Sequence, residues 1–140
     1  MKMEFYMTEV TATPTHFRLL SALRAIGPYL RESDSKDGHY LFDCLSVCVD
    51  DKQSPEEREF WGWWLELDAG SLVDNQSSYV AKVKLGLYNK AGDWKASKVP
   101  KKAQDEVART QRDFIVKLNK VLEERFELKL VFHKDSEELS

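Results

Sequence analysis

The feature that most constrains this chain is a run of large aromatic residues, Phe60-Trp61-Gly62-Trp63-Trp64. Because side chains alternate along a strand, a strand here sends Trp61 and Trp63 to one face and Phe60 and Trp64 to the other. Either both faces are buried, or one face forms the core and the other recognises a partner. We favour recognition, because a 140-residue chain with few predicted helices has little to cover a second face. Large aromatic residues also dominate the hot spots of protein interfaces.

Hydrophobic periodicity predicts the elements around this run. A helix is expected to begin at Thr13-Pro14 and to end before Gly27-Pro28, and a long helix is expected over about 101–125. Strands are expected over about 39–49, 60–67 and 79–88, with 126–132 either an edge strand or a tail. The strand over 39–49 is apolar at both phases, which is typical of a central strand covered on both sides. The predicted fold is α+β: an antiparallel sheet of three to five strands packed on a short N-terminal helix and a long C-terminal helix.

The length predicts a single domain spanning residues 1–140. Residues 1–12 are expected to form a loose N-terminal arm, and 134–140 an acidic tail that frays. No apolar run is long enough to span a membrane, and the first residues do not resemble a secretory signal. Cys44 and Cys48 would lie about 13 Å apart along a strand, too far for a disulfide. These features predict a cytoplasmic protein with reduced cysteines.

The charge distribution argues against a protein held to nucleic acid by phosphate contacts. The chain has 21 Lys and Arg against 24 Asp and Glu, a net charge of −3. Segment 82–102 is rich in lysine and segment 50–59 in carboxylates. The sharper of two interpretations is a protein-docking surface with a basic and an acidic sector; the other is ordinary solvation. A weaker alternative is a single-stranded nucleic-acid-binding module that uses the exposed aromatics and lysines.

No pattern in the chain predicts catalysis or a cofactor. The three histidines fall in different elements, and the sequence contains no nucleophile elbow, glycine-rich phosphate loop or zinc-protease motif. A small enzyme with an aromatic pocket remains the third hypothesis, since a carboxylate pair could act as general acid and base. We expect a protein that is not an enzyme and that binds no metal.

Two blocks are specific: E-F-W-G-W-W at 59–64 and K-A-G-D-W at 90–94. Two further segments, 26–32 and 40–49, belong with them. Together these segments closely resemble the Crl family of bacterial sigma factor-binding proteins. The resemblance implies a transcription activator that binds domain 2 of the stationary-phase sigma factor and favours its assembly with core RNA polymerase. It also implies a contact with the β′ clamp of the polymerase and no catalytic step.

The resemblance assigns five sigma-binding positions in this chain: Tyr29, Arg58, Phe60, Trp63 and Trp94. The arginine of the family meets an acidic segment of the sigma factor, which suits a guanidinium fork. Phe60 and Trp63 differ in strand phase, so contact by both would require a bulge at Gly62 or a contact around the strand start. We expect Trp63 and Trp94 to be at least partly exposed. We also expect a capping box of Ser54 and Glu57 to hold the backbone before Arg58.

Overall fold

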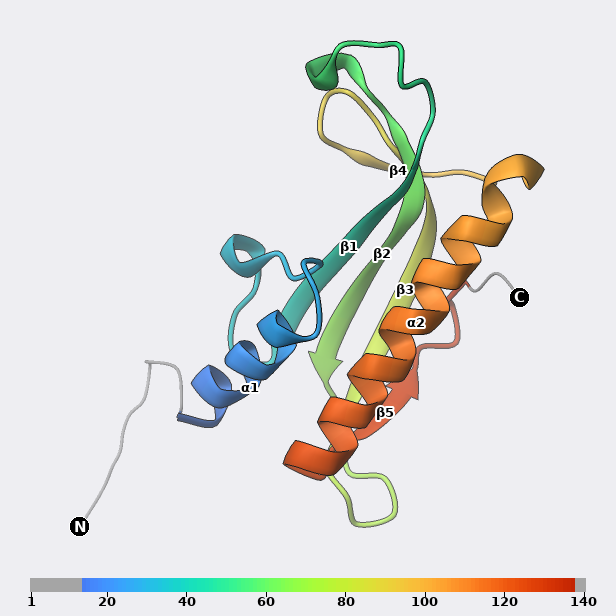
Figure 1. The fold of residues 1–140 in the computed structure, drawn as a ribbon. Helices are drawn as coiled ribbons and strands as arrows, with labels where there is room; N and C mark the ends of the chain where they lie inside the picture. The colour runs from blue at the N-terminus through green and yellow to red at the C-terminus, as the bar shows by residue number, and fades with distance from the viewer. Residues whose placement is uncertain (1–13, 138–140) are drawn as a thin grey trace.

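Three long strands form an antiparallel meander that carries the rest of the molecule (Figure 1). The computed structural model describes residues 14–137. The helices and strands are α1 (Pro14–Ala25), β1 (His39–Cys48), β2 (Phe60–Ala69), β3 (Ser78–Tyr88), β4 (Trp94–Ala96), α2 (Lys101–Phe126) and β5 (Lys129–Phe132). Two short 3₁₀ turns, η1 (Glu32–Asp34) and η2 (Pro55–Glu57), lie in the loops. The predicted α+β fold is confirmed, whereas the predicted arm at 1–12 lies outside the described residues.

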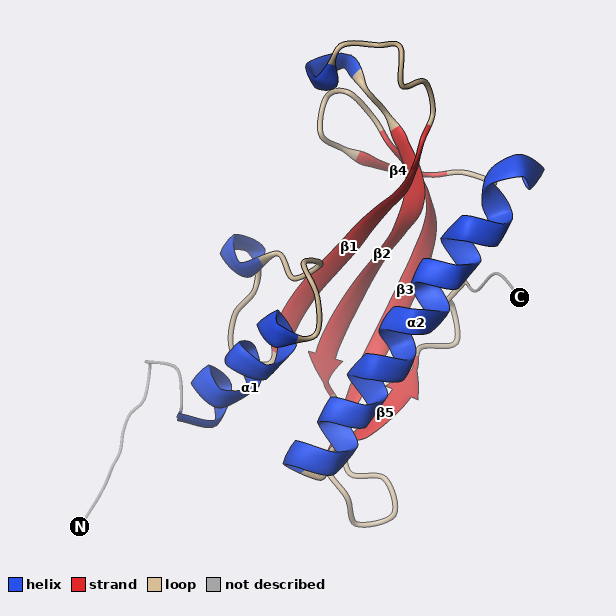
Figure 2. Ribbon diagram, viewed as in Figure 1, coloured by secondary structure: helices blue, strands red, loops and turns tan. Residues whose placement is uncertain are grey.

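The sheet has the order β1-β2-β3-β4, and β5 also pairs with β3 (Figure 2). All neighbours are antiparallel except β5, which runs parallel to β3. Two short strands thus share the same edge of β3: β5 pairs with residues 78–81 and β4 with residues 86–88. The segment after α2 is therefore the edge strand that the sequence left open as one of two possibilities.

Both helices pack on one face of the sheet, where the core lies (Figures 1 and 2). Helix α2 buries Val107, Phe114, Leu118 and Leu122, spaced as an amphipathic helix requires. The sheet side of the core is formed by alternate residues of the three long strands, among them Tyr40, Phe42, Trp63, Leu65, Leu67, Ala81 and Val83. Trp61 packs against the same core, so the predicted division of the tryptophan run between the two faces is confirmed.

The opposite face, called here the open face, has no helix over it among residues 14–137 (Figure 1). The prediction that β1 is a central strand with two covered faces is wrong: β1 is the first strand of the sheet, and Leu45 on the open face is 38% exposed. The sequence pattern misled because the open face is itself partly apolar, so both phases of β1 carry apolar residues.

A tight bend crosses the sheet at paired glycines, Gly62 of β2 and Gly86 of β3. The register of β1 shifts between Leu45 and Val47, directly opposite this part of β2. A Cβ atom on Gly62 would lie 1.9 Å from the carbonyl oxygen of Cys44, and one on Gly86 would lie 2.1 Å from that of Lys95. Only glycine permits such close approach of neighbouring strands, so these residues let the sheet curl at this end.

The end of the described chain is bound to the sheet. Ser136 Oγ accepts from the amide of Val83 and donates to the carbonyl of Ala81, at 3.1 Å each. The amide of Glu137 donates to Val83 O (2.8 Å), and its carboxylate accepts from the amide of Leu85 (2.9 Å). The expectation that the acidic tail frays is therefore wrong for 135–137, because these residues satisfy the edge of β3 between β5 and β4.

This pairing predicts that a chain ending at Lys134 loses protection at the edge of β3. We expect faster hydrogen exchange at the Val83 and Leu85 amides and a loss of about 1–3 kcal/mol of stability, because these two edge amides lose their acceptors. A chain ending at Glu137 keeps these bonds and is the matched control. Unchanged exchange at both amides in the shorter chain would contradict this account.

Candidate protein-binding site on the open face

Four aromatic side chains gather at one end of the open face and are named here the aromatic patch: Phe60, Trp64, Tyr88 and Trp94. Phe60 of β2, Tyr88 of β3 and Trp94 of β4 are successive partners in the sheet. The Trp64 and Trp94 rings stack with centroids 4.9 Å apart. The Tyr88 and Trp94 rings pack edge to face, with centroids 5.3 Å apart. All four are only half-buried. A half-exposed group of large rings with fixed geometry is typical of a protein-binding surface.

A nearly buried carboxylate holds one side of the aromatic patch. The side chain of Asp43, in β1, is only 11% exposed. Its Oδ2 accepts from the indole Nε1–H of Trp94 (3.1 Å) and from the guanidinium of Arg31 (2.6 Å). Burial alone would lower the pKa of Arg31, but Asp43 and the Tyr88 hydroxyl raise it above its ordinary value. Arg31 therefore stays charged and compensates the carboxylate.

Arg58 lies immediately before the aromatic patch, in the loop between β1 and β2. Its Nε–H donates to Gln53 O (2.9 Å) and its Nη2 to Asp51 O (3.0 Å), so the guanidinium closes the 51–58 loop upon itself. The predicted capping box is wrong: the side chain of Ser54 caps nothing, and the turn is held by backbone bonds instead. A 3₁₀ turn of three residues ends before the reciprocal side-chain bond of an α-helical capping box can form.

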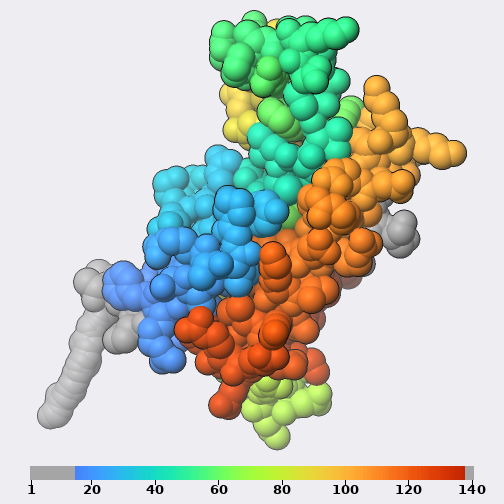
Figure 3. Space-filling view, in the orientation of Figure 1, coloured from blue at the N-terminus to red at the C-terminus, as the bar shows by residue number. Residues whose placement is uncertain are grey.

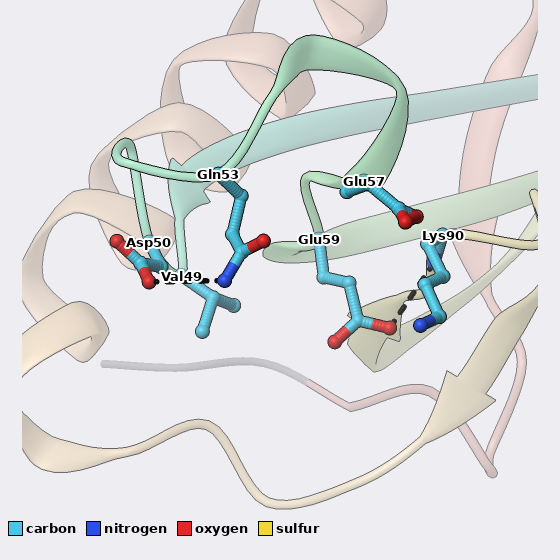
Figure 4. A pocket seen from close by; sticks show the side chains of 6 residues that line it. All are labelled: Val49, Asp50, Gln53, Glu57, Glu59 and Lys90. Carbon is cyan, nitrogen blue, oxygen red and sulfur yellow. Dashed lines mark hydrogen bonds between the residues drawn. The ribbon is translucent and has the colours of Figure 1, made fainter.

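The loop that carries Arg58 meets the β3–β4 turn at one end of the molecule (Figures 1 and 3). The carboxylate of Glu59 accepts from the amide of Lys90 at 3.1 Å and joins the two segments. Between them lies an open hollow of about 310 Å³, shown in Figure 4. It is lined by Val49, Asp50, Gln53, Glu57, Glu59 and Lys90, so the acidic sector predicted from the sequence faces this hollow.

Trp63 lies on the helix face of the sheet and not on the open face. It is 0% exposed, its ring stacks on Phe114 of α2 at 5.1 Å, and its Nε1–H donates to Thr110 Oγ1 at 3.2 Å. The expectation that Trp63 is partly exposed is wrong, because its strand phase points it under α2. A bulge is expected at Gly62 if both Phe60 and Trp63 contact the partner. The structure has a bulge in β1 opposite Gly62, but Phe60 and Trp63 still lie on opposite faces of the sheet.

Tyr29 lies at the edge of the sheet, beside β1. Its half-buried ring packs on Trp63 (5.6 Å) and Phe114 (5.5 Å), and its carbonyl accepts from the amide of Asp43 (3.0 Å). Burial raises the pKa of its hydroxyl, which therefore stays neutral. Tyr29 thus connects the core below the sheet to the strand that carries Asp43.

The structure therefore brings Phe60 and Trp94 together at one end of the open face, with Tyr29 at its edge and Trp63 beneath. Arg58 lies in the loop just before Phe60, where it binds carbonyls of that loop. Sequence reasoning omitted Arg31, Asp43, Trp64 and Tyr88 from the site. One signal was available: a carboxylate at position 43 interrupts the apolar run of residues 40–45. Among residues 14–137, no group of three or more His, Cys, Asp or Glu side chains could hold a metal ion.

Comparison with known proteins identifies the family. A family profile described as "Sigma factor-binding transcriptional regulator Crl" matches residues 7–140. The chain belongs to the Crl family. It is similar to a protein of Vibrio vulnificus named "Sigma factor-binding protein Crl", with 52% identity over 132 residues that cover 94% of this chain and 98% of that protein.

Two further relatives carry the same printed name. The protein of Vibrio cholerae is 52% identical over 130 residues, covering 93% of this chain and 97% of its own length. The protein of Photobacterium profundum is 42% identical over 132 residues, covering 94% and 96%. The family of transcriptional regulators is thus shown over nearly the whole chain. In the part of the chain that the structure describes, no helix is both long and apolar enough to cross a membrane.

The positions of the two tryptophans predict losses of stability of different size. Trp63→Ala removes a ring that is fully buried against α2 and should cost about 3–5 kcal/mol of unfolding free energy. Trp94→Ala removes a half-exposed ring and should cost clearly less. Chemical denaturation of the two variants and the wild type measures the difference. Equal losses would mean that Trp94 is as much a core residue as Trp63.

Proposed function

We propose that this protein is a transcription activator that binds domain 2 of the stationary-phase sigma factor through its open face. By holding the sigma factor it promotes assembly with core RNA polymerase and raises transcription of the genes that this sigma factor serves. The action needs only protein–protein contact, with no catalytic step and no cofactor. The place of action is the cytoplasm, where transcription occurs.

One observation carries this proposal: the aromatic patch is ordered and half-exposed on a sheet face that no described helix covers, in a chain of the Crl family. Stacking among Trp64, Tyr88 and Trp94 holds the planes of the rings before any partner arrives, which reduces the conformational entropy lost on binding. Rigid aromatic anchors of this kind contribute most of the binding energy in protein interfaces. The direct contacts therefore come from Phe60 and Trp94 and from the exposed edge of Tyr29.

Arg58 suits an acidic partner segment beside these rings. Two of its donor groups are used by the loop carbonyls of Asp51 and Gln53, which hold the guanidinium in place. The fork has five N–H donors, so others can bind a carboxylate of the sigma factor. Trp63 takes a different part: buried beneath the sheet, it supports the strand that carries Phe60.

The loop end of the molecule, with its acidic hollow, lies beside this surface and is free to meet a second protein. We place the contact with the β′ clamp of RNA polymerase there. The hollow presents Asp50, Glu57 and Glu59 around one lysine, a charge pattern that fits a basic segment and fixes the register of docking.

Arg58→Ala should weaken binding to sigma domain 2 by about 2–5 kcal/mol. A carboxylate of the partner would lose the paired hydrogen bonds of the guanidinium while the interface excludes water from it. Arg58→Lys should be intermediate, since an ammonium cannot form the same paired bonds. Arg112→Ala, an exposed arginine of α2, is the matched control and should bind as the wild type does. Isothermal titration calorimetry with isolated domain 2 measures all four proteins.

The Arg58 variants also need a structural readout, because Arg58 holds its own loop. Hydrogen exchange should accelerate within 51–58 in Arg58→Ala, while the melting temperature changes little. Wild-type affinity in Arg58→Ala would remove this residue from the site. No binding by the wild-type protein would overturn the proposed function.

The isolated protein should not bind promoter DNA sequence-specifically at physiological salt. On the open face, Lys82 and Lys84 share the surface with Asp43, Glu66 and Asp68, which leaves no basic track for phosphates. Footprinting of promoter DNA with this protein alone should therefore show no protection. A footprint, or an affinity for single strands that falls by orders of magnitude as salt rises, would favour the nucleic-acid-binding alternative.

A further inference from the structure

The carboxylate of Asp43 joins three segments that are far apart in the sequence. It lies in β1, yet it accepts from Trp94 in β4 and from Arg31 in the segment between α1 and β1. The backbone repeats the connection, because the amide of Asp43 donates to Tyr29 O (3.0 Å) and the amide of Arg31 donates to Leu41 O (2.8 Å). Two of the five expected sigma-binding residues, Tyr29 and Trp94, are thus bonded directly to Asp43.

The curl of the sheet makes the bond between Asp43 and Trp94 possible. Strands β1 and β4 are separated by two other strands, and neighbouring strands in a sheet lie about 4.8 Å apart. Gly62 has no side chain and lets β2 approach β1 closely, and Gly86 in the same way lets β3 approach β4. Stacked on Trp64, the indole of Trp94 then reaches Asp43 with its Nε1–H.

The bond fixes a degree of freedom that stacking leaves open. Stacking on Trp64 holds the plane of the Trp94 indole but not its rotation within that plane, whereas a hydrogen bond from Nε1 fixes the rotation. The carboxylate is nearly buried, so it needs a cation, and Arg31 supplies one at 2.6 Å. Arg31 is thereby held at the rim of the aromatic patch.

We propose that Asp43 is a positioning residue of the sigma-binding surface: its carboxylate fixes the Trp94 indole and the Arg31 guanidinium so that the aromatic patch is pre-formed before the partner binds. This inference rests on the proposed function, since it concerns the same surface. Asp43 acts through Trp94, and removing its charge frees the indole without removing any contact ring.

The first test is the affinity of Asp43→Asn for isolated sigma domain 2, measured by calorimetry. Loss of a charge-assisted bond within the patch should weaken binding about tenfold to a hundredfold. The matched control is Asp68→Asn, which removes a carboxylate from the same sheet face, where its partner is His39. The control should bind as tightly as the wild type.

A second measurement separates positioning from a general loss of structure. In the free protein, the indole N–H signal of Trp94 in ¹⁵N-labelled samples should exchange with water faster in Asp43→Asn, while the signals of Trp61 and Trp63 stay unchanged. The assignment comes from Trp94→Phe, which removes the indole N–H signal and keeps a smaller aromatic ring. If Asp43→Asn unfolds, Asp43→Glu still tests the bond: it keeps the negative charge and every contact ring but displaces the carboxylate from the indole, and it should bind more weakly than the wild type.

The decisive comparison is the double variant. In the Trp94→Phe background the donor is already gone, so Asp43→Asn should weaken binding by no more than about threefold further. A full additional loss in that background, or wild-type affinity in Asp43→Asn, would overturn the positioning role and leave the proposed function standing. Failure of the wild-type protein itself to bind domain 2 would overturn the proposed function and this inference together.

Discussion

A single long helix covers one face of a five-stranded sheet, and this constraint governs the rest of the structure. Helix α2 buries the alternate residues of β1, β2 and β3 that point toward it, with α1 filling the remaining corner. No second layer is present over the other face among the described residues. The aromatic side chains sent there by strand alternation cannot enter a core, so they pack on one another and keep part of their surface in contact with solvent.

The residues of the tryptophan run therefore have two different structural roles. Trp61 and Trp63 stabilise the sheet from beneath, and Phe60 and Trp64 contribute to the patch above. Because Phe60 and Trp63 lie on opposite faces, a partner on the open face could contact Phe60 directly but could not contact Trp63. A variant that loses binding is thus informative only beside a measurement of its fold, because a residue under the sheet and a residue on it both weaken the complex when removed.

The sequence was sufficient for the elements that have strong periodicity. The helices over 14–25 and 101–126 and the three long strands follow from spacing alone, and so does the alternation within the tryptophan run. It was insufficient where distant segments meet. The bond from Trp94 to Asp43 depends on the curl at Gly62 and Gly86, and the tail depends on an unfilled edge of β3. Neither is encoded in any local pattern, and the apolar open face made β1 resemble a central strand.

The position of α2 late in the chain has a consequence for how the molecule is made. The meander of β1, β2 and β3 pairs strands that follow one another in the chain and can form while synthesis continues. Apart from the corner filled by α1, its core face, with Trp63, Leu65 and Leu67, has no cover until α2 has emerged. The edge of β3 over residues 78–85 is completed only by residues 129–137. A nascent chain that stalls before α2 therefore presents a broad apolar sheet face to the ribosome surface and to chaperones, and protection of that face reports the emergence of α2.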